Sequence, residues 1–248
     1  MHSGQACLDD VLKCSKGSGT ATLRRPAELL LSEDGSVTMI SGPTSAALVE
    51  WRESVAAIYS DVRATHDADP RATWLRFRER RDRLYKSHPC SALTDAEKQS
   101  FTGFAYHEYD PNSCIVGEID HAVAEYSLDI EVSEGTLRCR RIGVARFSHA
   151  GQTASLDLFW LDIYGGGLWL PVGDQTNGKT TYSGGRYLYD TTKGANLGWR
   201  SDGSRILLDF NFLYPPSCAL SDSWICPLCP PANRLPFKLE AGERTRSA

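Results

Sequence analysis

Six of the twelve prolines in this 248-residue chain fall within one segment, residues 214–236. The same segment carries three of the eight cysteines, and it directly follows a strand-like run that begins at Ile206. Proline has no N–H group and fixes φ, so this segment can be neither a helix nor a central strand. We therefore interpret residues 214–236 as a stiff loop that forms the lid or one wall of a site.

The overall composition excludes several classes of protein. A net charge of −4 leaves no basic stripe of the kind that nucleic-acid binders use to displace counterions. No apolar run approaches the ~18 residues of a membrane helix, and the first thirty residues lack a secretory pattern. Without export, the cysteines are expected to be reduced thiols. We expect a cytoplasmic protein that binds neither nucleic acid nor membrane; its oligomeric state does not follow from the sequence.

The chain divides into regions of different composition. Residues 1–42 are rich in glycine, serine and threonine, and we expect them to be a disordered leader outside the domain. Residues 43–240 are predicted to form a single domain, with a helical segment at 43–98 packed on a β body at 101–240. Residues 241–248 are predicted to be a tail.

The helical segment is indicated by an apolar stripe with helical spacing. Its first members are Leu48, Trp51, Val55, Ile58, Tyr59 and Val62. Pro70 ends this helix and starts a second one that runs to about Lys86. The charged residues of the second helix are a candidate contact for phosphate or nucleic acid, but a solvated face is the favoured interpretation. Thr94 and Glu97 form a capping box, which predicts one further helical turn.

From Phe101 onward the apolar period changes to two, which predicts strands. The predicted strands are 101–108, 114–119, 124–132, 136–147, 154–163, 167–171, 179–190 and 205–213. Asn177-Gly178 is a strong signal for a two-residue hairpin turn. The predicted fold class is α+β, a predominantly antiparallel β barrel or sandwich with two N-terminal helices.

Two polar side chains stand out on the last predicted strand. Alternation places Asp209 and Asn211 on one face beside leucines, where an unpaired carboxylate would cost several kcal/mol. Arg186, on the strand 179–190, is the expected partner of Asp209. Their pair could be a structural ion pair or an anchor for the acidic group of a ligand, and the structural interpretation is favoured.

The cysteines of the loop allow two interpretations. Cys226 and Cys229 have the C-x2-C spacing of zinc sites, and Cys218 could supply a third thiolate, although no fourth ligand is evident. The alternative, which we favour, is that these cysteines only pack beneath the loop. A thioredoxin-type redox pair needs a helix after the C-x2-C motif, and the surrounding prolines argue against it.

Four motifs carry a resemblance to a known family. They are Tyr164–Gly167, Tyr182–Leu188, Asp209–Phe212 and Cys226–Leu235. In these motifs the chain resembles the bacterial domain-of-unknown-function 1684 family, over roughly residues 45–243. The resemblance implies a shared site that gathers Asp174, Tyr182, Arg186, Asp209, Asn211, Cys218, Cys226, Asn233 and Arg234. Gly173 and Ala232 depart from the family pattern, since the family often has an arginine and a glutamate there, which puts any inherited activity in question.

These observations lead to one main functional hypothesis. We expect a β-barrel protein whose cavity, closed by the loop 214–236, binds a small polar or anionic molecule. The expected ligand-binding residues are Arg186, Asn211, Asp174, Asn233 and Arg234. In an enzymatic version Asp209 is the general base and Tyr182 the proton donor, although a carboxylate beside a cation has a lowered pKa, which weakens it as a base.

Two alternatives to this hypothesis remain. One is a non-catalytic protein whose loop holds zinc through Cys218, Cys226 and Cys229. The other is a divergent pseudo-enzyme, which the side chains absent at Gly173 and Ala232 would suggest.

Overall fold

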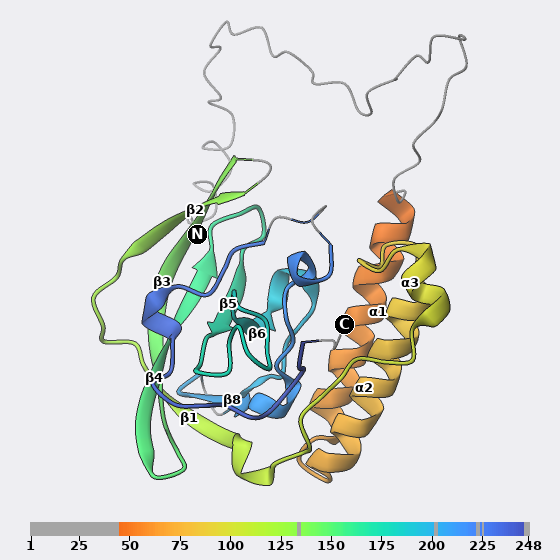
Figure 1. The fold of residues 1–248 in the computed structure, drawn as a ribbon. Helices are drawn as coiled ribbons and strands as arrows, with labels where there is room; N and C mark the ends of the chain where they lie inside the picture. The colour runs from red at the N-terminus through yellow and green to blue at the C-terminus, as the bar shows by residue number, and fades with distance from the viewer. Residues whose placement is uncertain (1–44, 133–134, 201–202, 222–223, 225, 246–248) are drawn as a thin grey trace, which may run out of the picture. The chain divides into compact units, whose positions relative to one another are not determined.

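The computed structural model describes residues 45–132, 135–200, 203–221, 224 and 226–245 (Figure 1). These residues all belong to the unit that spans Pro43–Ala248. The predicted leader at 1–42 lies outside the described residues. In the described part of the chain no helix combines the length and apolar character needed to cross a membrane.

Three helices open the domain, as the sequence predicts. They are α1 (Ser45–Thr65), α2 (Pro70–Ser87) and α3 (Asp95–Ser100). The start of α2 is fixed by Asp69, whose side chain accepts the N–H of Ala72, and by a proline in its first turn. The predicted capping box of Thr94 and Glu97 is present at the start of α3.

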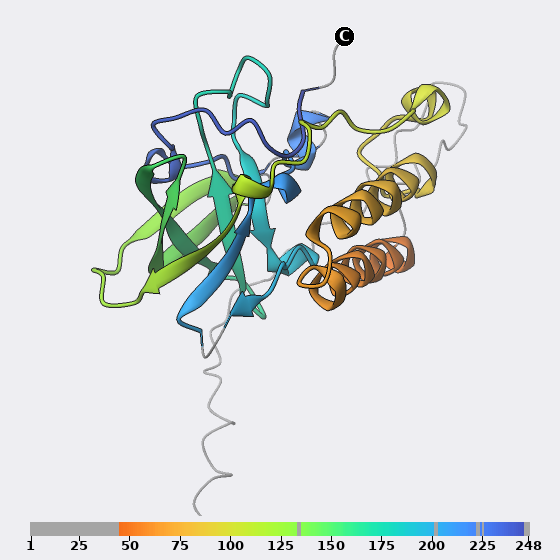
Figure 2. The same cartoon turned by 90° about the horizontal axis from the view of Figure 1, so that it is seen from below.

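The rest of the domain is one antiparallel sheet of eight strands. The strands are β1 (Cys114–Asp120), β2 (Ser127–Val132), β3 (Gly135–His149), β4 (Gln152–Leu161), β5 (Gly167–Val172), β6 (Arg186–Asp190), β7 (Trp199–Arg200) and β8 (Arg205–Asp209). Their order is β6-β5-β4-β3-β1-β8-β7, with β2 paired to β3. The sheet curls into a half-barrel beside the helices (Figure 2). The predicted α+β class with N-terminal helices is confirmed.

Three predicted strands differ from the structure. Residues 101–108 contain a single bridge, Tyr106 to Glu243, instead of a strand. β6 begins only at Arg186, because turns occupy most of the chain before it. The last strand stops at Asp209 and is followed by a 3-10 turn, Phe210–Phe212, since the Asp209 carboxylate accepts the N–H of Asn211 at 3.0 Å.

The helices pack on the sheet through their apolar stripes. One core cluster joins helix residues to strand residues; the helix members are Ile58, Tyr59, Val62, Trp74, Phe77 and Leu84. A hydrogen bond of 2.9 Å from Trp74 Nε1 to the carbonyl of Asn211 lies in this interface. The helical segment and the β body therefore share one core.

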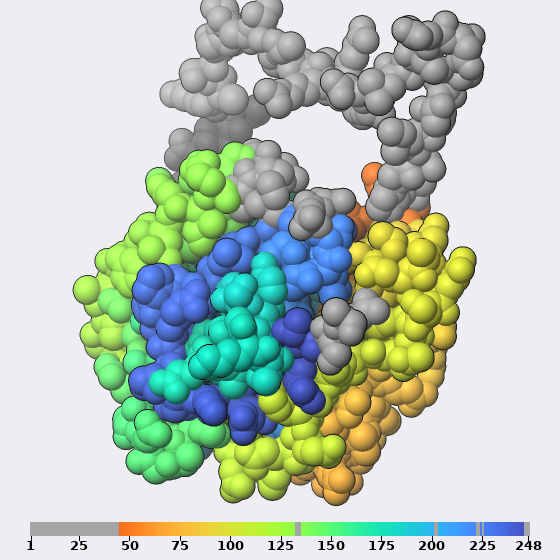
Figure 3. Space-filling view, viewed as in Figure 1, coloured from red at the N-terminus to blue at the C-terminus, as the bar shows by residue number. Residues whose placement is uncertain are grey.

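The C-terminal segment is part of the body. Ala241 and Glu243, which the sequence places in a tail, are buried. The N–H of Glu243 donates to the carbonyl of Leu213 at 2.8 Å, and that of Arg244 donates to Ala105 at 2.8 Å. In Figure 3 this segment lies between the turns before β6 and the chain after α3. Residues 239–245 therefore act as a strap that ties distant parts of the domain together.

Replacing Gly242 in this strap by alanine should destabilise the protein. Gly242 has φ +75°, and an added Cβ would lie 2.6 Å from Leu213 Cβ and 2.8 Å from the Leu213 carbonyl oxygen. Gly151 has nearly the same φ, +76°, with no atom within 4 Å of such a Cβ. In urea denaturation, Gly151→Ala should cost about 1 kcal/mol for backbone strain, and Gly242→Ala considerably more. Equal losses of unfolding free energy in the two variants would mean that the strap accommodates the added methyl group without further cost.

Candidate functional site

Arg186 is fully buried and bonded to the strap. Its Nη2 donates to Asp174 Oδ2 and to the carbonyl of Leu239, both at 3.0 Å. Its Nη1 donates to the carbonyl of Glu243 at 3.2 Å and to that of Ala241. Four acceptors from two separate segments thus surround one guanidinium, which makes Arg186 a structural clasp.

Asp209 has a different partner from the one predicted. Its Oδ2 lies 2.8 Å from His66 Nε2, and its Oδ1 accepts the side-chain amide of Asn211 at 2.8 Å. The expected Arg186–Asp209 ion pair is therefore wrong. The strand ends at Asp209, and the acceptors of Arg186 come from the strap and from Asp174, which strand alternation cannot reveal.

The predicted pocket around these residues is also displaced. Arg186, Asp209 and Asn211 each expose 0% of their surface, so none of them lines a hollow that water could enter. Their polar groups are bonded mainly to protein, as burial requires. The structure therefore places these three side chains in the interior of the domain.

The remaining predicted site residues are dispersed. Asn233 is fully buried and donates to the carbonyls of Asp157 at 2.9 Å and Pro171 at 2.8 Å, so it anchors the loop to the sheet. Arg234 is exposed. Tyr182 is half-buried, with its hydroxyl 3.7 Å from Cys218 Sγ.

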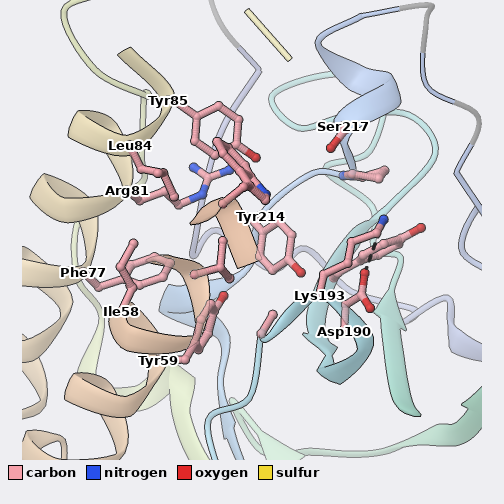
Figure 4. Close-up of a pocket in the computed structure, with 15 residues that line it drawn as sticks. Ile58, Tyr59, Phe77, Arg81, Leu84, Tyr85, Asp190, Lys193, Tyr214 and Ser217 are labelled. Atoms are coloured by element: carbon pink, nitrogen blue, oxygen red, sulfur yellow. Dashed lines mark ion pairs between the residues drawn. The ribbon is translucent and has the colours of Figure 1, made fainter. Parts of the chain in front are cut away.

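A cavity of about 70 Å³ lies where α1 and α2 face the end of β6 and the start of the loop (Figure 4). Its polar lining residues are Tyr59, Arg81, Tyr85, Tyr187, Asp190, Lys193, Tyr214 and Ser217, and apolar residues from α1 and α2 complete the wall. Pro216 and Ser217 belong to the proline-rich loop, so the loop contributes one wall of this cavity.

Arg81 is the dominant charge in the cavity wall. Its guanidinium carbon lies 4.8 Å from the ring centroid of Tyr85, 4.3 Å from that of Phe104 and 5.5 Å from that of Tyr214. Such an aromatic cage stabilises a cation. Burial works against the charge of Arg81, but Glu243 and nearby tyrosines outweigh it and raise the pKa of Arg81.

The hydrogen bonds of Arg81 are only partly satisfied. Nη1 donates to Glu243 and to the hydroxyl of Tyr106, the latter at 3.1 Å. Burial raises the pKa of Glu243 to about 7, although Arg81 beside it acts in the opposite direction. Nη2 of Arg81 is buried and has no hydrogen-bond partner. Arg81 therefore lines the cavity with one of its buried nitrogens still unpaired.

Lys193 and Asp190 connect the cavity to a second hollow. Lys193 Nζ lies 3.6 Å from Asp190 Oδ2, and its side chain is about half exposed. Both residues also line a shallower hollow of about 350 Å³, which Leu137, Trp169 and Pro227 help to form. Burial disfavours the charge of Lys193, but Asp190 outweighs this effect and raises its pKa. The cation of Lys193 and the carboxylate of Asp190 thus belong to the walls of both hollows.

Two thiols meet beside this region. The side chains of Cys218 and Cys226 are hydrogen-bonded, and the backbone groups of Cys218 and Ser217 also bond Cys226 Sγ. The contact with Cys218, helped by Lys193, lowers the pKa of Cys226, although burial acts against it. The same contact, together with burial, raises the pKa of Cys218. The loop thiols in contact are therefore Cys218 and Cys226, rather than the two cysteines of the C-x2-C motif, Cys226 and Cys229.

Cys229 lies apart from this pair. Its Sγ is 3.5 Å from the carbonyl oxygen of Asn233 and 3.6 Å from that of Pro230, and burial raises its pKa to about 12. Among the described residues, the three loop cysteines do not form a group of converging ligand atoms; the group that does is His66, Cys114 and Asp209. Zinc bound by Cys218, Cys226 and Cys229 stays a prediction.

The sequence contains a signal that Arg81 is buried. Arg81 continues the apolar stripe of Trp74 and Phe77 at the next helical turn, and Leu84 follows three residues later. An arginine on the apolar stripe indicates a buried cation, but here it was counted with the solvated charges of α2. His66 and Lys193 gave no comparable signal, because each lies beyond the end of a helix or strand.

The comparisons agree on a family without a known activity. A family model described as "Protein of unknown function (DUF1684)" matches residues 99–244. The solution NMR structure of an uncharacterised protein from gene locus rrnAC0354 of Haloarcula marismortui is similar, with 30% sequence identity and a TM-score of 0.53. The similarity covers 73% of this chain and 97% of that one. No curated protein matches.

Replacing Arg186 by methionine should strongly destabilise the fold. The change leaves the buried Asp174 carboxylate without its cation and removes the donor to three carbonyls, and breaking a buried pair costs about 3–5 kcal/mol. Arg138→Met, which breaks an exposed pair with Asp129, is the matched control and should change little. The urea midpoints of the two variants measure the difference. If Arg186→Met unfolds at the wild-type midpoint, Arg186 is not the clasp.

Alkylation of Cys226 should have its pH midpoint below that of an ordinary thiol, because the contact with Cys218 lowers its pKa. Iodoacetamide reacts with the thiolate, so labelling should rise through this midpoint and then level off. In Cys218→Ser the main cause of the lowered pKa is gone, and the midpoint should move upward. Mass spectrometry of the labelled peptides gives both midpoints. A wild-type midpoint above pH 8 would contradict the assigned contact.

Proposed function

We propose that this chain, which belongs to the DUF1684 family of proteins of unknown function, binds a small molecule with an anionic oxygen-bearing end. The binding site is the cavity between α1, α2 and the sheet, which we call the Arg81 cavity. The half-barrel is the scaffold, and the start of the proline-rich loop is one wall.

The observation that carries the proposal is the unpaired Nη2 of Arg81. Leaving a buried donor unsatisfied costs about 1–3 kcal/mol, and more for a charged group. A carboxylate oxygen of a ligand would remove this cost by accepting a charge-assisted hydrogen bond. Arg81 is held in place by Glu243 and by its aromatic cage, so the donor is preorganised for such a ligand.

The walls of the cavity favour a flat ligand. Tyr59, Tyr85 and Tyr214 present rings and hydroxyls to it. Burial raises the pKa of Tyr59 and of Tyr214, so these hydroxyls stay protonated and can donate hydrogen bonds. A volume of about 70 Å³ would hold about two water molecules at about 30 Å³ each. This space fits the acidic end of a ligand, while an apolar remainder could extend past Lys193 into the larger hollow.

The proposed function is binding, without an assigned reaction. Asp209 exposes no surface and cannot reach a molecule in the Arg81 cavity. The predicted acid–base roles of Asp209 and Tyr182 therefore gain no support from this site. In this proposal the ligand is held in the Arg81 cavity, whereas the sequence predicts Arg186, Asn211, Asp174, Asn233 and Arg234 as its ligands; that set stays a prediction.

The alternative from the sequence, zinc in the loop, rests on the spacing of Cys226 and Cys229 and on the contact between Cys218 and Cys226. The bonding of Cys229 to two carbonyls speaks against its participation. This alternative predicts that Cys226→Ser abolishes zinc binding.

Benzoate should bind to the Arg81 cavity, and its binding should quench or shift the fluorescence of the nearby Trp51. Benzamide, which lacks the negative charge, should bind at least tenfold more weakly than benzoate. Arg81→Lys keeps the positive charge but loses the planar fork, so its affinity for benzoate should fall at least tenfold. Arg83→Lys, on the exposed face of α2, is the matched control and should bind as the wild type does. Fluorescence titration measures all four affinities.

A second variant tests whether a loss of benzoate binding comes from the cavity itself or from a general effect on the fold. Ala195 is buried in the cavity wall, and Ala195→Leu should fill the cavity and abolish benzoate binding without loss of stability. If benzoate binds Ala195→Leu and Arg81→Lys as tightly as the wild type, the proposed site is wrong.

A further inference from the structure

Three elements that are distant in sequence bring metal-ligating side chains together. His66 follows the end of α1, Cys114 is the first residue of β1, and Asp209 is the last residue of β8. β1 and β8 are antiparallel, and their register pairs Cys114 directly with Asp209. Residues opposite each other in such a pair place their side chains on the same face. The end of α1 brings His66 to that face.

The spacing of the ligand atoms suits a single metal ion. His66 Nε2 lies 2.8 Å from Asp209 Oδ2 and 3.8 Å from Cys114 Sγ, and all three atoms lie within 4.8 Å of one another. In a tetrahedral zinc site, a nitrogen and an oxygen ligand lie about 3.3 Å apart, and a sulfur and a nitrogen ligand about 3.6 Å. The observed distances differ from these values by roughly half an ångström or less, a shift that side-chain rotation supplies.

The surrounding residues hold the ligands in the required orientation. The N–H and side-chain amide of Asn211 donate to Asp209 Oδ1 at 3.0 and 2.8 Å, which leaves Oδ2 directed at His66. His66 Nδ1 lies 3.6 Å from Asp67 Oδ1 but has no hydrogen-bond partner, and Asp67 is itself paired with Arg200. A bonded second oxygen on a ligating carboxylate, as on Asp209, is a common outer-shell feature of metal sites.

The negative charge of the Asp209 carboxylate also requires a cation nearby. The Asp209 carboxylate exposes 0% of its surface. In the described part of the chain its one ion-pair partner is His66, with no arginine or lysine. A buried carboxylate normally has a full charge partner or a metal. A divalent ion would neutralise both Asp209 and the Cys114 thiolate.

We propose that His66 Nε2, Cys114 Sγ and Asp209 Oδ2 bind one zinc ion. A nitrogen, a sulfur and an oxygen ligand together are typical of zinc, which accepts all three. Cys114 is only partly buried, so a water molecule can approach from its side as the fourth ligand. The ion joins the end of α1 to two central strands, and its role is to fasten the helical segment to the sheet.

The test uses the full chain, stripped of metal and titrated with Co²⁺. A cysteine thiolate bound to Co²⁺ gives a charge-transfer absorption band in the near ultraviolet, which reports the sulfur ligand directly. The wild type should bind one equivalent of Co²⁺ with this band, and Zn²⁺ should displace it. Cys114→Ser should lose the band and bind at least tenfold more weakly. Cys226→Ser is the matched control and should keep both.

Stability provides an independent readout. Because zinc binds only the folded state tightly, it should raise the melting temperature of the wild type and of Cys226→Ser. Zinc should not raise the melting temperature of His66→Gln. A cooperative melt of metal-free His66→Gln would show that this variant is folded. Absence of a thiolate–Co²⁺ band in the wild type would overturn the proposal. A band that is lost in Cys226→Ser and kept in Cys114→Ser would overturn it too, and would place the metal in the loop.

Discussion

The buried guanidinium of Arg186 is the interaction on which the rest of the domain depends. It collects the Asp174 carboxylate and three carbonyls of the strap, at a place where none of these groups meets water. Taking a cation out of water is expensive, and the cost is offset only when its donors find acceptors of good geometry. This requirement fixes the path of residues 239–243, and with it the position of Glu243.

Glu243 links the clasp to the candidate site. Its carbonyl accepts from Arg186, whereas its side chain pairs with Arg81 in the cavity wall. Arg81 is therefore paired from the strap side, and its second nitrogen is buried without a hydrogen-bond partner. The geometry of the Arg81 cavity thus depends on a residue that the sequence places in a tail. The cavity and the clasp are two ends of one chain of polar contacts.

Local patterns predicted the helices well and the polar interior poorly. The stripe from Leu48 to Val62 and the caps at Asp69 and Thr94 depend on neighbours within a few residues, so the sequence shows them directly. Strand alternation failed at Asp209, where a side chain bonded its own backbone and ended the strand. The partners of Arg186, and the pairing of Asp209 with His66, could not be predicted, because these groups lie 12 or more residues apart along the chain.

The clasp also has a consequence for synthesis. Arg186 emerges from the ribosome before its carbonyl acceptors, which lie 53 to 57 residues farther along the chain. Until the strap is made, the guanidinium has only Asp174 as a partner and cannot be enclosed without loss. Closure of the half-barrel must therefore wait until residues 239–243 have been translated. In a nascent chain stalled before residue 239, the helices would be formed but the interior of the half-barrel would remain accessible to chaperones.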